Sequence, residues 1–113
     1  MTIIINEDRS VKKMYSGKEG TQNEENVSTL QFVIPERYSE FDKKLVFISK
    51  IDNFTKDLTN NEYTIDTDVS QYKRIECYLM MTDSEAKEEF RSEIFELKFY
   101  ESQESEGEYE YNS

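Results

Sequence analysis

Asp66 and Asp68 have the spacing of calcium ligands, because Asp66-Thr67-Asp68-Val69-Ser70 begins like an EF-hand loop. Such a loop needs glycine at its sixth position, for a sharp turn, and a bidentate acid at its twelfth. This chain has Gln71 and Cys77 at those two positions. We therefore expect a solvated acidic turn here and no bound calcium.

The other residue types that catalysis needs are scarce. The chain has no histidine, which is the usual general base and the commonest metal ligand. Ser16-Gly17-Lys18 lacks the first glycine of a phosphate-binding loop. The many carboxylates could pair as in a glycosidase, but no apolar pocket is visible around any of them, so we interpret them as solvated surface. The sequence therefore predicts no enzyme, no cofactor and no metal site.

The chain is acidic, with a formal charge of −11 from 25 acidic and 14 basic residues. Residues 101–113 are rich in glutamate and contain no base, and we predict that they form a flexible tail. A surface this negative repels phosphate, so we expect a protein partner and no direct binding to nucleic acid or membranes. The apolar start Met1–Ile5 is too short for a signal peptide, which predicts synthesis in the cytoplasm.

Two stretches, Lys73–Met81 and Ser92–Tyr100, alternate between apolar and polar residues and are predicted to be adjacent strands at the centre of the fold. A period of two is typical of a half-buried strand. The single cysteine, Cys77, lies in phase with the apolar set, so we interpret it as a packed hydrophobe and not as a reactive thiol. The residues predicted to face inward are Ile75, Cys77, Leu79, Met81, Phe95, Leu97 and Phe99.

A helix is the alternative for part of this region. Three apolar residues have helical spacing, so residues Ser84–Lys98 could form an amphipathic helix. Phe95 and Phe99 would point away from its apolar face, whereas a strand places them together. We therefore prefer a strand at Glu93–Tyr100, with a short helical turn at Ser84–Glu89.

Five further segments have strand, turn or loop signals. Thr2–Asn6 is β-branched and is predicted to be an edge strand, and Val27–Ile34 alternates like a second strand. Leu45–Ser49 is apolar on both phases, so we expect it to be covered on both faces or to meet another subunit. Glu36–Asp42 suits a helical or 3₁₀ turn at the core edge, and the polar, glycine-containing Ser16–Asn26 suits a mobile loop.

Six to eight short strands with almost no long helical period predict one all-β domain over residues 1–100. The predicted architecture is an antiparallel β-sandwich with at most one or two short helical turns. Parallel sheets are excluded from this prediction because crossover helices are missing.

Two segments are the most specific parts of a pattern that extends over residues 3–100. They are Phe32-Val33-Ile34-Pro35-Glu36-Arg37-Tyr38 and Phe90-Arg91-Ser92-Glu93-Ile94-Phe95-Glu96-Leu97-Lys98-Phe99. The pattern resembles small structural proteins in the virions of bacteriophages that infect low-GC Gram-positive bacteria. This resemblance implies an immunoglobulin-like sandwich that serves in the virion as a head fibre, decoration, tail or baseplate accessory protein, without active-site residues.

Such a protein is expected to dock onto other virion proteins and possibly onto a second copy of itself. The doubly apolar strand and the predicted edge strand are suitable docking elements, the latter by adding to a partner's sheet. Half-exposed tyrosines suit the core edge or an interface, and the sequence does not separate these two. The predicted interface residues are Ile3, Ile5, Val46, Ile48, Tyr38, Tyr63 and Tyr78.

An acidic inhibitor that mimics nucleic acid and blocks a host defence nuclease is the alternative function. The small size and the charge of −11 fit this class equally well. A mimic holds its carboxylates on one rigid face, whereas many carboxylates of this chain lie in the tail or alternate with lysines such as Lys43 and Lys87. We therefore favour the structural role.

Overall fold

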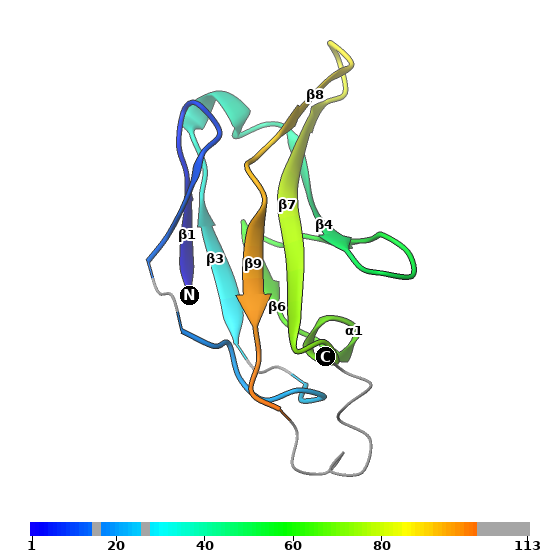
Figure 1. Ribbon diagram of the computed structural model, residues 1–113. Coiled ribbons are helices and arrows are strands. Elements are labelled where there is room, and N and C mark those ends of the chain that lie inside the picture. The colour runs from blue at the N-terminus through cyan, green and yellow to red at the C-terminus, as the bar shows by residue number, and fades with distance from the viewer. Residues whose placement is uncertain (15–16, 26–27, 102–113) are drawn as a thin grey trace.

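The computed structural model describes residues 1–14, 17–25 and 28–101, which form two β-sheets packed around a common core (Figure 1). One sheet has the strand order β2-β1-β3-β6, and the other has the order β5-β4-β7-β8, with β9 also paired to β7. The predicted β-sandwich with short helical turns is confirmed, and the predicted tail from residue 102 onward lies outside the described residues. The elements are β1 Thr2–Ile5, β2 Val11–Lys13, β3 Thr29–Val33, η1 Glu36–Tyr38, β4 Asp42–Ile48, β5 Phe54–Asp57, β6 Glu62–Thr64, α1 Thr67–Ser70, β7 Arg74–Asp83, β8 Glu88–Arg91 and β9 Phe95–Lys98.

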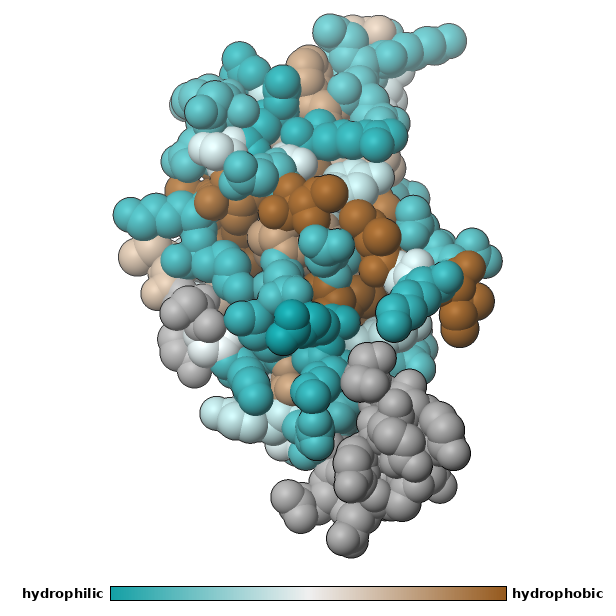
Figure 2. Space-filling view, in the orientation of Figure 1, coloured by the Kyte–Doolittle hydropathy of each residue, from teal (hydrophilic) through white to brown (hydrophobic). Residues whose placement is uncertain are grey.

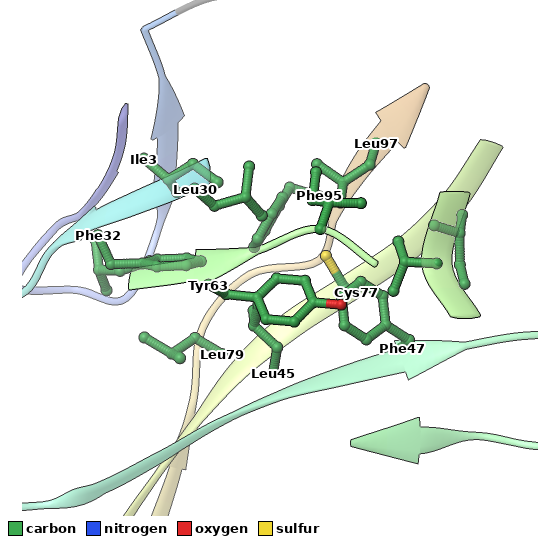
Figure 3. Close-up of a cluster of buried hydrophobic side chains, with 14 of the residues drawn as sticks. Ile3, Leu30, Phe32, Leu45, Phe47, Tyr63, Cys77, Leu79, Phe95 and Leu97 are labelled. Atoms are coloured by element: carbon green, nitrogen blue, oxygen red, sulfur yellow. The ribbon is translucent and has the colours of Figure 1, made fainter. Parts of the chain in front are cut away.

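The core lies between the sheets and is built from the predicted inward phases of β7 and β9. These two strands are antiparallel neighbours, with Ile75 opposite Leu97 and Cys77 opposite Phe95. Side chains from β1 and β3 meet them from the other sheet, as Figure 3 shows for Ile3. Alternation along each strand therefore places one apolar row of each sheet in a shared, dry interior.

The segment between β7 and β9 is a hairpin and not a helix. β8 continues the antiparallel ladder of β7, with Asp83 opposite Glu88. Asp83 Oδ1 accepts the backbone N–H groups of Glu85 and Ala86 at 3.0 and 3.3 Å. The predicted helical turn at Ser84–Glu89 is therefore wrong, because an aspartate that bonds to the next backbone amides favours a tight turn.

Residues 92–94 interrupt the strand pairing between β8 and β9, and we call this segment the break. Its hydrogen bonds connect the two sheets along one side of the sandwich. Ser92 Oγ accepts the N–H of Leu79 at 2.8 Å, where a backbone carbonyl would continue the ladder. The N–H of Glu93 donates to the carbonyl of Arg9 at 2.8 Å, and Glu93 Oε1 accepts the N–H of Val11 at 3.1 Å. Because Arg9 and Val11 belong to the β1–β2 hairpin, the break connects one sheet to the edge of the other.

β1 lies inside its sheet, so the prediction of an edge strand is wrong. Ile3 is opposite Lys13 in the antiparallel neighbour β2 and opposite Phe32 in the parallel neighbour β3. This sheet is therefore mixed, because β1 and β3 pair in parallel while its other strand pairs are antiparallel. A parallel pair needs a connection long enough to return the chain, and the residues between β1 and β3 provide that length.

The polar segment that was predicted to be a mobile loop is described over Gly17–Glu25, which we call the strap. The N–H of Glu19 donates to the carbonyl of Lys98 at 2.8 Å, and the N–H of Tyr100 donates to the carbonyl of Gly20 at 2.7 Å. The strap thus pairs with the backbone at the end of β9 and just beyond it. Local composition does not reveal this pairing, because its partner lies nearly eighty residues away in the sequence.

Candidate functional site

Ile3 and Ile5, two of the predicted interface residues, are core residues. Their side chains are 0% and 2% exposed, and β1 is hydrogen-bonded on both sides. A partner's strand therefore has no open edge to add to at β1. The sequence misled here because β-branched residues suit a buried inner strand as well as an edge strand.

Tyr38 and Tyr63 also point into the fold, with exposed fractions of 1% and 7%. The ring of Tyr38, at the end of η1, packs against Phe41 and Phe90 with centroid distances of 5.4 Å in both cases. The ring of Tyr63 lies 5.9 Å from that of Phe47, between the sheets (Figure 3). Of the two roles that the sequence left open for these tyrosines, the structure places both at the core.

The other three predicted residues, Val46, Ile48 and Tyr78, lie together on the outer face of the five-stranded sheet. Val46 is directly opposite Tyr78, and Ile48 is two residues further along β4. Met80, which sequence reasoning missed, has the same phase as Tyr78 on β7. The signal was available, because two large apolar residues interrupt the otherwise polar phase of this strand. We call Val46, Ile48, Tyr78 and Met80 the outer-face patch.

The patch is partly covered by its own sheet. Val46 is 7% exposed, and the other three residues are half-buried. Figure 2 shows apolar side chains in the middle of one face of the molecule, with polar side chains around them. An apolar centre within a polar rim is the usual anatomy of a protein–protein interface.

Charged side chains surround the patch in cross-strand rows. One row runs Asp57, Lys44, Met80, Arg91, and a second row, on the other side of Val46 and Tyr78, runs Ile48, Glu76, Glu96. The face has near-equal numbers of the two signs, which makes it almost neutral on a chain of charge −11. In the phase of Val46 and Tyr78 the bases are Lys44, Arg74, Arg91 and Lys98, and the acids are Asp42, Asp57, Glu76, Glu89 and Glu96.

Most of these charges already have a partner within the chain. The guanidinium of Arg91 lies 5.3 Å from the ring centroid of Tyr78, so it covers the edge of the patch. Hydrogen bonding to Glu89 raises the pKa of Arg91 and keeps it charged. The ion pairs are Lys44–Asp57, Arg91–Glu89, Arg74–Glu96 and Lys98–Glu96, at 3.9, 3.0, 3.9 and 3.8 Å.

The carboxylates that resemble a calcium loop are used by a lysine. Lys56 Nζ, on β5, lies 3.1 Å from Asp66 Oδ2 and 2.5 Å from Asp68 Oδ2. Tyr63 donates its hydroxyl to Asp66 Oδ1 at 3.0 Å. Hydrogen bonding to Asp68 raises the pKa of Lys56, and burial raises the pKa of Tyr63. Both groups therefore keep their protons near neutral pH, and neither can act as a general base.

A shallow cavity of about 530 Å³ lies beside this cluster, between β5 and α1. Its lining includes Ile51, Phe54 and Tyr72, together with Lys56 and Asp68, whose charges neutralise each other. The cavity therefore offers apolar contacts, and the two charged groups Lys56 and Asp68 in its lining are paired with each other.

Cys77 lies in the core, as its phase predicted, with an exposed fraction of 0%. Burial raises the pKa of its thiol, so the thiolate that nucleophilic chemistry needs is disfavoured. Among residues 1–14, 17–25 and 28–101, no group of three or more acidic or cysteine side chains is arranged to hold a metal ion.

Within the described part of the chain, no helix has the length and apolar character needed to cross a membrane. Comparison with protein-family models, with curated proteins and with solved structures finds no match to this chain.

Proposed function

We propose that this chain is a non-enzymatic structural protein of a bacteriophage particle, which docks onto other capsid, tail or baseplate subunits. The observation that carries the proposal is the outer-face patch, a group of aliphatic, aromatic and methionine side chains on a rigid sheet with charges around it. Tyr, Met and Arg are enriched in the centres of protein interfaces, where Lys and acids are depleted.

Two further observations support a docking role. The net charge of −11 opposes nonspecific association of free subunits, which suits a protein made in many copies. The β-sandwich presents the patch on strands held by cross-strand hydrogen bonds, so docking needs little ordering of the chain. The immunoglobulin-like topology and the place in the virion remain implications of the sequence resemblance.

The test is the protein content of purified phage particles. Mass spectrometry is expected to find this chain in particles from cells that express its gene together with the capsid and tail genes. Absence from complete particles would contradict the proposal. Tight, salt-sensitive binding to a defence nuclease, with no chain in the particles, would instead favour the nucleic-acid mimic.

Met80→Glu tests the patch itself. Met80 lies between Lys44 and Arg91 in its cross-strand row, so a glutamate there has two cationic neighbours and the strand should still fold. The charge should nevertheless oppose docking through an apolar centre, and we expect lower occupancy in particles. Val33→Glu is the matched control, because Val33 is 53% exposed on the outer face of the other sheet.

A further inference from the structure

We infer that a second copy of this chain occupies the outer-face patch, so that the protein is a two-fold symmetric dimer with its five-stranded sheets face to face. The inference rests on the docking role proposed above and names the partner at that surface. Charge, pairing and symmetry carry it.

The charge of the face favours a second copy over a basic partner. The face is almost neutral, whereas the rest of the chain carries nearly all of the net charge of −11. A basic partner would find little excess of acid here and more elsewhere. Another copy of the same acidic chain meets the least like-charge repulsion at this face.

The ion pairs within the face lower the cost of covering it. Arg91 is held between Glu89 and the ring of Tyr78, and Lys44 lies beside Asp57. These groups already have partners, so a second copy does not have to supply every counter-charge when water leaves. The patch between them adds apolar area that is half-exposed in the single copy.

The two-fold operation makes the face complementary to itself. If the axis runs along the strands, between β4 and β7, each cross-strand row faces the same row of the second copy in reverse order. Val46 then meets Tyr78 of the second copy, and Asp57 meets its Arg91. If the axis runs across the strands, rows exchange, so Tyr78 meets Tyr78 and Arg91 meets Glu96. Either axis in the plane of the face places Arg91 opposite an acid and pairs the central residues Val46 and Tyr78 with apolar residues. Met80 then meets Lys44 of the second copy with the first axis and its Glu76 with the second.

Sedimentation equilibrium of the full chain tests the dimer. We expect a reversible monomer–dimer equilibrium in the micromolar range, as befits a small interface. Tyr78→Glu should raise the dissociation constant about tenfold or more with either axis, because Tyr78 meets Val46 or Tyr78 of the second copy, and Val33→Glu should leave it unchanged. Far-ultraviolet circular dichroism of each variant checks that the fold is kept.

A charge exchange tests the geometry independently. Arg91→Glu should weaken the dimer, and a second substitution should restore it. Restoration by Asp57→Arg identifies the axis along the strands, and restoration by Glu96→Arg identifies the axis across them. The inference would be overturned if both double variants fold and each dimerises no more tightly than Arg91→Glu alone.

The dimer and the proposed function can fail separately. A chain that stays monomeric at high micromolar concentration, yet is present in particles and lost from them with Met80→Glu, would show that a different subunit occupies the patch. That result overturns the dimer and leaves the docking role standing. A dimer that is absent from particles supports the inference and contradicts the virion role.

Discussion

Glu19 is buried, although glutamate is a residue type that is almost always found at the surface. It lies in the strap with an exposed fraction of 7%. Its Oε1 accepts a hydrogen bond from Ser28 Oγ at 3.2 Å, whereas its Oε2 is buried without a partner among the described residues. Burial raises the pKa of this carboxyl, because a charged oxygen without a partner is costly to remove from water.

Stability should therefore depend on the protonation of Glu19. A raised folded-state pKa means that its contribution is complete below the ordinary value of about 4.3 and is lost as pH rises through the folded-state value. Glu19→Gln removes the charge, and we expect it to increase the free energy of unfolding at neutral pH by about 1 kcal/mol. Urea unfolding at neutral and acidic pH measures this gain, which should shrink in acid.

Glu40→Gln is the control, because Glu40 is exposed and should change the free energy of unfolding little at either pH. A loss of stability in Glu19→Gln at neutral pH would show that the ionised carboxylate is favoured in the strap, contrary to this expectation.

At the scale of elements, the break between β8 and β9 is the feature that sequence reasoning could not foresee. The prediction correctly placed Phe95 and Leu97 on the inward phase of a strand that pairs with β7. Alternation reports which way a side chain faces, and it carries no information on whether the backbone hydrogen bonds continue. Ser92 looks like an ordinary polar position, yet it is 6% exposed and replaces a ladder bond with its hydroxyl.

Ser92→Ala should be destabilising for this reason. The N–H of Leu79 loses its acceptor inside the fold, and the expected decrease in the free energy of unfolding is about 1–2 kcal/mol. Amide hydrogen exchange at Leu79 should become faster. Ser84→Ala, in the exposed turn of the hairpin, is the matched control and should stay within about 0.5 kcal/mol of wild type.

At the scale of the whole molecule, the two sides of the sandwich are closed by different interactions. The backbone of Glu93 joins the sheets on one side. On the other side Lys56 of β5 reaches Asp66 and Asp68, which follow β6 in the other sheet. The first closure consists of hydrogen bonds that involve backbone groups. The second consists of ion pairs.

Lys56→Met should therefore remove the ion pairs on the second side and lower the free energy of unfolding. The side chain of Lys56 is 22% exposed and those of its partners more, so solvent limits the loss to about 1 kcal/mol. The loss should be smaller at high salt, where the wild-type ion pairs are screened. Thermal unfolding at low and high salt measures both effects, with Lys44→Met as the control, because its pair with Asp57 is 3.9 Å long and largely exposed.

For the site, as for the fold, alternation predicted which way side chains face, and it did not predict what packs against them. Alternation correctly indicated that β4 carries apolar residues on both phases, and it thereby found Val46 and Ile48. It could not rank Tyr38 against Tyr78, because a ring with a polar tip suits the core edge and the surface equally. Nor could it place β1, since the neighbours of a strand are decided by packing between distant segments and not by its own pattern.

The closure between Val11 and Glu93 joins residues that are 82 positions apart in the chain. The strap likewise needs Tyr100 before its hydrogen bonds can form. During synthesis, the contacts of the first hairpin with Glu93 can therefore form only after almost the entire described chain has emerged from the ribosome. Contacts this distant in sequence make folding slow, on the order of milliseconds to seconds, and leave the early strands exposed to wrong pairing in the meantime.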